Sequence, residues 1–122
     1  MGSTKAPAEQ VADIALAFPE ATRVDHGSHA QFLVRKKTFG YFLDNHHGDG
    51  IVSICCKVLP GDNAALVKSD PARFYLPAYI GSRGWVAFRL DTKRVDWEDV
   101  RELLKTSYLL CAPKKLASVV RA

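Results

Sequence analysis

The segment 69–91, SDPARFYLPAYIGSRGWVAFRLD, has the pattern of a β-hairpin and decides the expected fold. An aromatic run at 74–80 is followed by Gly81-Ser82-Arg83-Gly84 and then by the alternating segment 85–90. Glycines at both ends of the turn can take the positive φ angles that tight hairpins need. The segment therefore predicts two antiparallel strands with Arg83 at an exposed tip.

The rest of the chain adds three strands upstream and helices on both sides of the hairpin. Pro7 suits the first turn of a helix, because its missing N–H costs nothing there, and Pro19 stops that helix. The last long helix is expected to begin after Asp96, which can act as its N-cap. Strands are expected at residues 30–34, 38–43 and 51–57, and shorter helices at 63–68 and 114–120.

The order of these elements is α-β-β-β-α-β-β-α, and most links between strands are short hairpins. Such links favour an antiparallel sheet with helices collected on one face. We therefore expect an α+β fold, a two-layer structure with an antiparallel β-sheet of about five strands. The chain of 122 residues is expected to form a single domain over 1–122, with 1–6 as a disordered tail.

The composition is that of an ordinary globular domain, with 48% hydrophobic and 25% charged residues. No apolar run is long enough to cross a bilayer, and the first residues lack the apolar core of a secretion signal. A cytoplasmic protein with no membrane contact is therefore expected. The three cysteines form no CxxC pair and are expected to be buried thiols. A net charge of +4 and a pI near 9.1 permit a polyanionic partner but do not require one.

Four local features carry a resemblance to a known family. They are Ala17-Phe18-Pro19-Glu20, the hairpin from Phe32 to Gly40, Asp70-Pro71 leading to Gly84-Trp85-Val86, and Leu103 through Ser107-Tyr108 to Pro113-Lys114-Lys115. On these features the chain resembles the MmcQ/YjbR family over about residues 8–120. The resemblance implies an α/β fold similar to type III secretion chaperones and to the frataxin-like CyaY fold. It also implies DNA binding through a "double wing".

The first wing departs from the family pattern, because Arg35-Lys36 stand where Gly-Gly or Asn-Gly often precedes the lysine. The expected strand directions place this turn and Arg83 at the same end of the sheet. Lys and Arg at hairpin tips can contact backbone phosphates without reading the base sequence, although charged turns are often simply solvated. We therefore expect a DNA-binding domain and not an enzyme. Its expected DNA-contacting residues are Arg35, Lys36, Lys37 and Arg83.

A protein-interaction or chaperone-like adapter is the second interpretation. Trp85 and Arg89 alternate onto the same face of the last strand of the hairpin, and Tyr79 lies in the strand expected beside it. An open sheet face with these side chains suits a ligand or a protein partner, including a second copy in a homodimer.

A small-ligand or metal-binding domain is the third interpretation. The loop Asp44-Asn45-His46-His47-Gly48-Asp49-Gly50 offers weak candidates in His46, His47 and Asp49. Adjacent histidines rarely face one ion, and the two glycines suit a turn. We therefore expect a turn without a tightly bound metal, and no cofactor. Asp25, His26 and His29 could form part of a catalytic pair, but no positioned nucleophile accompanies them.

Overall fold

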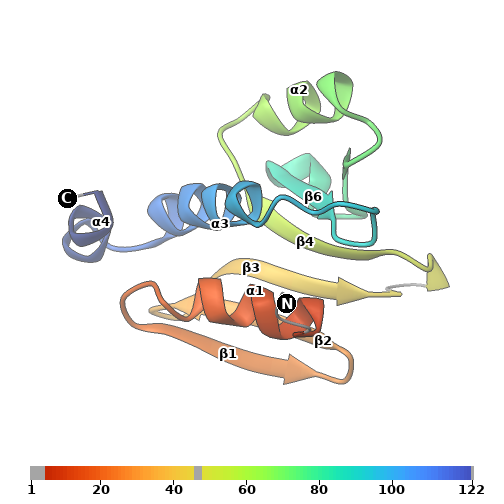
Figure 1. Cartoon of the computed structure of the whole chain (residues 1–122). Coiled ribbons are helices and arrows are strands. Elements are labelled where there is room, and N and C mark those ends of the chain that lie inside the picture. Colours follow the sequence, from red (N-terminus) through yellow and green to blue (C-terminus); the bar gives the residue numbers. More distant parts are fainter. Residues whose placement is uncertain (1–4, 46–47, 122) are drawn as a thin grey trace.

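The computed structural model describes residues 5–45 and 48–121 (Figure 1). Its helices are α1 (Pro7–Ala15), α2 (Asp62–Ser69), α3 (Trp97–Cys111) and α4 (Lys114–Arg121), with a 3₁₀ turn η2 (Gly81–Arg83). Its strands are β1 (Ala21–His26), β2 (His29–Val34), β3 (Lys37–Asp44), β4 (Val52–Lys57), β5 (Phe74–Tyr75) and β6 (Trp85–Arg89). Two start signals are confirmed, since Pro7 opens α1 and Asp96 caps α3 by accepting a hydrogen bond from the Glu98 backbone N–H at 3.0 Å.

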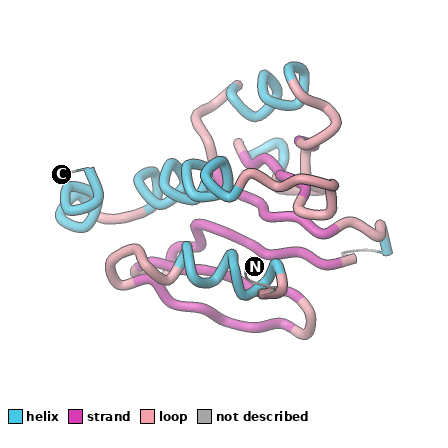
Figure 2. Tube along the Cα trace, in the orientation of Figure 1, coloured by secondary structure: helices cyan, strands magenta, loops and turns pink. Residues whose placement is uncertain are grey.

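All these strands form one antiparallel sheet in the order β1-β2-β3-β4-β6-β5. Apolar side chains from each of the four helices pack against the same side of the sheet, and Figure 2 shows α1 and α3 lying across it. The expected two-layer α+β fold is confirmed, with a 6-stranded sheet in place of about five strands.

The main core lies between the helices and this face of the sheet. Its largest fully buried side chains are Tyr108, Phe32, Phe39, Phe88, Ile54 and Leu104. Cys55 and Cys56 lie on opposite faces, as expected for neighbours in a strand. Cys56 belongs to the main core, whereas Cys55 packs with Trp85 and Ala87 in a smaller cluster on the other face.

Residues 21–26 form an edge strand that the sequence pattern did not predict. Ala21 pairs with Val34 at one end of β1, and His26 pairs with His29 at the other. The apolar members of β1 are Ala21 and Val24, which lie on different faces of the strand. An edge strand of this kind shows no alternating apolar pattern, because it buries little on either side.

The tight hairpin expected within 74–90 is wrong in its first half. β5 stops at Tyr75, and its two residues pair with Phe88 and Ala87, so that residues 76–84 lie outside the ladder. Residues 76–84 form a loop that ends in η2. Pro77 has no N–H for a strand ladder, and Tyr79 has a left-handed φ of 66°, which breaks an extended strand. Arg83 therefore lies in a 3₁₀ turn and not at the tip of a two-stranded ribbon.

The C-terminal half of α3 fixes one end of the sheet. The buried Ser107 hydroxyl donates to the Phe39 carbonyl at 2.6 Å and accepts from the Lys57 backbone N–H at 2.9 Å. The Tyr108 hydroxyl donates to the Pro19 carbonyl at 2.6 Å. Since Phe39 is the bulged residue of β3, α3 holds the start of β3 and the end of β4 together.

Candidate functional site

The two expected wings lie at the same end of the sheet. Strand pairing puts Val34 beside Lys37 at the β2–β3 turn, and it puts Lys57 beside Trp85 where β4 ends and β6 begins. Because β3 and β6 both run antiparallel to β4, the start of β3, the end of β4 and the start of β6 lie at the same end of the sheet. The β2–β3 turn and η2 therefore project from that end. α3 also ends here, since the Cys111 thiol contacts the Thr38 carbonyl at 3.5 Å.

We call this region the basic end. It is defined by the cations Lys36, Lys37, Lys57, Arg83, Lys114 and Lys115. Figure 1 shows α4, which begins at Lys114, at the left of the sheet near the β2–β3 turn. Among the residues that the structure describes, no carboxylate oxygen lies within 4.0 Å of any of these cationic nitrogens.

The positive charges of the basic end influence the Cys111 thiol at the end of α3. Burial raises the pKa of the Cys111 thiol, and the positive charges of Lys57 and Lys37 oppose that increase. Both ammonium groups therefore act on one buried atom from different strands. A cluster of like positive charges at this end of the sheet favours an anionic partner.

The β2–β3 turn has an unusual backbone for its residues. Arg35 and Lys36 have φ angles of 48° and 70°, so both central positions are left-handed, as in a type I′ turn. Such positions favour Asn and Gly, and an L-residue with a long side chain pays about 1–2 kcal/mol there. With Arg35 and Lys36 at these positions, the turn is strained and carries two cations.

Unlike Lys36 and Lys37, Arg35 is already paired with a carboxylate among the described residues. Its guanidinium forms two hydrogen bonds with the Glu20 carboxylate, Nε to Oε1 at 2.5 Å and Nη2 to Oε2 at 2.9 Å. The hydrogen bond from Arg35 lowers the pKa of Glu20, and the same contact raises the pKa of Arg35. In this turn the charges available to a ligand are therefore those of Lys36 and Lys37.

The expected ligand face around Trp85 is largely covered. The loop 76–80 folds over it, so that Trp85 is only 9% exposed and its ring lies 5.4 Å from that of Tyr41. Arg89 shares this face at the far end of β6, where its guanidinium bonds to the Asp91 carboxylate at 2.9 and 3.1 Å. Tyr79 is 84% exposed on top of the loop and borders a hollow of about 220 Å³.

The histidine loop gives no metal centre among the described residues. His46 and His47 lie outside the part of the chain that the structure describes, so their predicted role stays a prediction. The Asp49 carboxylate accepts a hydrogen bond from the Ile51 backbone N–H at 2.9 Å, as a turn residue does. Within 5–45 and 48–121, no group of three or more metal-ligating side chains occurs.

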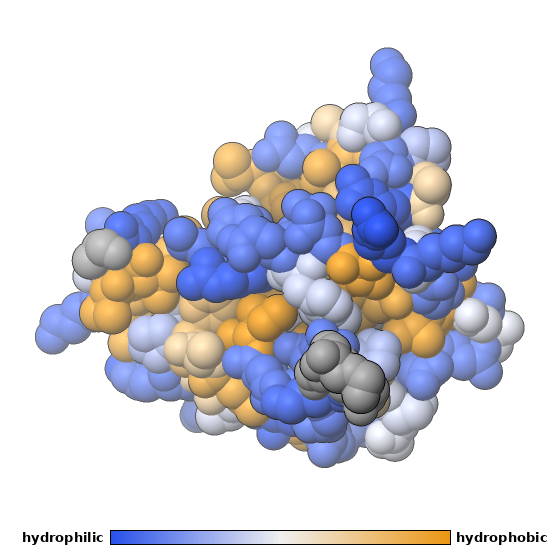
Figure 3. Space-filling model, in the orientation of Figure 1, coloured by the Kyte–Doolittle hydropathy of each residue, from blue (hydrophilic) through white to orange (hydrophobic). Residues whose placement is uncertain are grey.

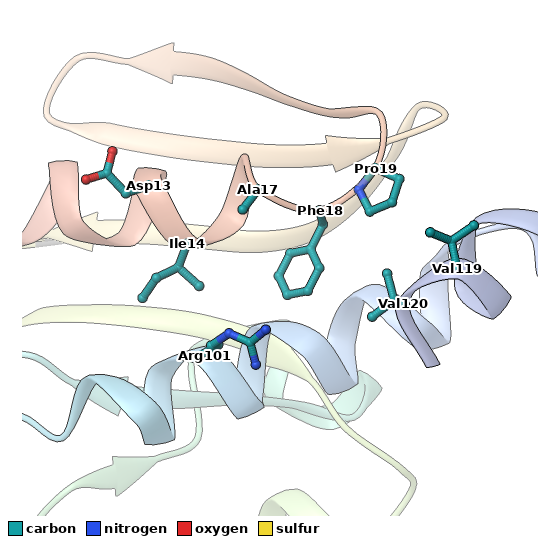
Figure 4. Close-up of a pocket in the computed structure, with 8 residues that line it drawn as sticks. All are labelled: Asp13, Ile14, Ala17, Phe18, Pro19, Arg101, Val119 and Val120. Carbon is teal, nitrogen blue, oxygen red and sulfur yellow. The ribbon is translucent and has the colours of Figure 1, made fainter. Parts of the chain in front are cut away.

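An apolar groove between α1, α3 and α4 was not expected from the sequence. It has a volume of about 500 Å³, and Figure 4 shows the Phe18 ring between Ile14 on one side and Val119 and Val120 on the other, with Arg101 on the α3 side. Figure 3 shows apolar surface between the helices and over α4 at the left. The guanidinium of Arg101 lies 3.7 Å from the Glu102 carboxylate, so its charge is already balanced.

The comparisons with known proteins agree with this architecture. The model of the YjbR family matches residues 16–110. The chain belongs to the YjbR family. A solved structure with the same fold is that of the Deinococcus radiodurans protein DR2400, which carries domain DUF419. It is 18% identical, covers 93% of this chain and 87% of its own, and superimposes with a TM-score of 0.71. None of the curated proteins matches the chain.

This YjbR-family chain has basic-end residues that sequence reasoning did not select. Lys57, Lys114 and Lys115 join Lys36, Lys37 and Arg83 only because α3 ends against β3 and β4. The expected residue Arg35 has the Glu20 partner described above. No helix of the described chain is both long and apolar enough to span a bilayer.

Proposed function

We propose that this YjbR-family protein binds the phosphate backbone of DNA through the basic end. The observation that carries the proposal is the set of cations, from several elements, that have no carboxylate within 4.0 Å among the described residues. Lys36, Lys37 and Arg83 are the principal contacts, and Lys114 and Lys115 extend the same surface. Contacts of this kind give affinity and a strong salt dependence without sequence preference.

The rigidity of the basic end supports this role. Ser107 binds α3 to Phe39 of β3, close to the β2–β3 turn, and Tyr108 binds α3 to Pro19, which precedes the Glu20 that pairs with Arg35. The lysines therefore project from a fixed support. A preorganised surface loses less conformational entropy on binding than a mobile one. Backbone strain at Arg35 and Lys36 is also typical of segments maintained for function.

The test is a binding assay with duplex and single-stranded DNA at low and at physiological salt. Lys36→Ala and Arg83→Ala should each weaken binding and reduce the slope of log affinity against log salt by about one unit. Lys68→Ala is the matched control, because Lys68 is an exposed lysine near the end of α2, outside the basic end. It should change affinity less.

Two results would contradict the proposal. One is unchanged DNA affinity when Arg35, Lys36 and Lys37 are all replaced by alanine. The other is an intact protein that binds no DNA even at low salt. Circular dichroism of each variant would show that the fold is retained.

A second candidate is self-association through Tyr79. This side chain is 84% exposed in a left-handed backbone conformation, and the hollow beside it is lined by apolar residues. Exposed aromatic side chains beside apolar hollows often form the centre of protein interfaces. Tyr79→Ser should then shift a dimer to a monomer in sedimentation velocity, whereas Leu16→Ser, on the helix-covered side, should not.

A further inference from the structure

Another hollow opens at the basic end, on the side of η2 that faces α2. It has a volume of about 560 Å³ and is lined by the end of β4, the start of α2 and the loop 81–84. This volume falls within the range of small-ligand sites, about 300–1,000 Å³. Two of its lining residues are cations, Lys57 and Arg83.

A buried amide fixes the walls of this hollow. Asn63 of α2 is 8% exposed, and its Nδ2 donates to the Gly81 carbonyl at 2.8 Å and to the Trp85 carbonyl at 3.2 Å. The Val58 backbone N–H donates to the Gly84 carbonyl at 3.0 Å. The segments that present Lys57 and Arg83 are thus held together before any ligand arrives.

The charge of the hollow is uncompensated within the described chain. Neither Lys57 nor Arg83 has a carboxylate oxygen within 4.0 Å among residues 5–45 and 48–121. Ser82 also lines the hollow, but its hydroxyl donates to the Tyr79 carbonyl at 3.2 Å. The two cations are therefore the groups left to attract an anion.

Part of the lining is apolar. Val58, Pro60 and Leu76 all border the hollow, and Leu76 is 48% exposed there as a large hydrophobic side chain. A simple inorganic anion would leave this apolar surface in water. A ligand that joins an anionic group to a planar, largely apolar one would cover both parts.

We propose that this hollow binds a nucleotide, with its phosphate held by Lys57 and Arg83 and its base or sugar against Leu76. Phosphate accepts charge-assisted hydrogen bonds from both cations, while the apolar part displaces water from the lining. The inference rests on the proposed function, because both ligands carry phosphate groups. It differs in using Lys57, which is not among the principal DNA contacts proposed above. The nucleotide is either free or one unit of a nucleic-acid strand.

The experiment is titration calorimetry of the whole chain with four probes. They are inorganic phosphate, adenosine monophosphate, adenosine without phosphate, and a short single-stranded oligonucleotide. The monophosphate should bind more tightly than inorganic phosphate, and adenosine should not bind measurably. Oligonucleotide binding that Lys57→Gln weakens would assign the site to a strand. Monophosphate binding that Lys57→Gln weakens, with oligonucleotide binding absent or unchanged in that variant, would assign it to a free nucleotide.

Lys57→Gln separates this site from the wings, whereas Arg83 belongs to both. Lys57→Gln and Arg83→Gln should each weaken monophosphate binding by about tenfold, the loss expected for one charge-assisted hydrogen bond. Lys68→Gln, a nearby lysine outside the hollow, should bind as the native chain does. Equal melting temperatures for Lys57→Gln and the native chain would show that the variant folds.

The outcomes distinguish this inference from the proposed function. Lys36→Ala and Lys37→Ala could weaken oligonucleotide binding while Lys57→Gln leaves the affinity for both the monophosphate and the oligonucleotide unchanged. In that case the wings bind DNA and the nucleotide site is refuted. If Lys57→Gln abolishes monophosphate binding in a protein that binds no DNA, the nucleotide site stands alone. Absence of binding by all four probes overturns it.

Discussion

Arg35 and Glu20, 15 residues apart, meet in a bidentate ion pair, and both have left-handed backbones with φ angles of 48° and 58°. The two parallel N–H···O bonds have the geometry that an arginine would offer to a phosphate group. Glu20 thus occupies the donors of the most strongly basic side chain in the first wing. The pair lies where β1 begins and β2 ends, so it also joins an edge strand to its neighbour.

Glu20→Gln should strengthen DNA binding. It removes the negative charge beside Arg35, so that the guanidinium can contact a phosphate. The slope of log affinity against log salt should then rise by about one unit, and adding Arg35→Ala should cancel the gain. Glu98→Gln makes the same change of charge at the far end of α3 and is the matched control. A gain as large in Glu98→Gln would mean that only net charge matters.

Lys36→Gly should stabilise the fold while weakening DNA binding. Lys36 has a φ of 70°, which glycine adopts without steric cost, so the free energy of unfolding should rise by about 0.5–1 kcal/mol. Lys37→Gly is the control, because Lys37 begins β3 and glycine there should destabilise it. Urea denaturation would measure both. A less stable Lys36→Gly protein would show that the turn is not strained.

The parts of the fold that the sequence predicted are those that bury an alternating or helical apolar pattern. β2, β3 and β4 and the long helix α3 fall in this class, and so do the opposite faces of Cys55 and Cys56. β1 was missed because an edge strand buries too little to show a pattern. Residues 76–80 were predicted as a strand because they are mostly apolar; instead they form a loop beside the sheet face without pairing with it.

The candidate site divides in the same way. Lys36, Lys37 and Arg83 could be predicted as exposed basic residues because turns expose such side chains, and that is a local property. The partner of Arg35 and the approach of Lys57 to Arg83 depend on contacts between distant segments. No local pattern encodes them. The position of Lys114 near the first wing likewise follows from where α3 ends.

Ser107→Ala should destabilise the protein by about 1–3 kcal/mol, the cost of leaving buried polar groups without partners. The change would orphan the Lys57 backbone N–H and the Phe39 carbonyl. Ser118→Ala is the control, since that hydroxyl bonds only to a carbonyl of its own exposed helix turn. Thermal unfolding followed by circular dichroism should show a large loss for the first variant. Equal melting temperatures for the two variants would show that the Ser107 hydrogen bonds do not stabilise the basic end.

The buried thiols should make the protein lose stability at alkaline pH. Burial raises the pKa of Cys55 from 9.0 to about 12, and it raises the pKa of Cys56 well above the ordinary value. Above pH 9 the unfolded chain releases thiol protons that the folded chain keeps, so rising pH favours unfolding.

The loss should run from about pH 9 to pH 12, at about 1.4 kcal/mol per pH unit for each thiol kept protonated. Guanidinium denaturation at pH 8 and at pH 10.5 would measure it, and Cys55→Ala should show a shallower fall between these two values. The same burial predicts that iodoacetamide labels Cys55 and Cys56 at pH 8 only after unfolding. Rapid labelling of the native protein would show that these strands open to solvent, and the alkaline loss would then need another source.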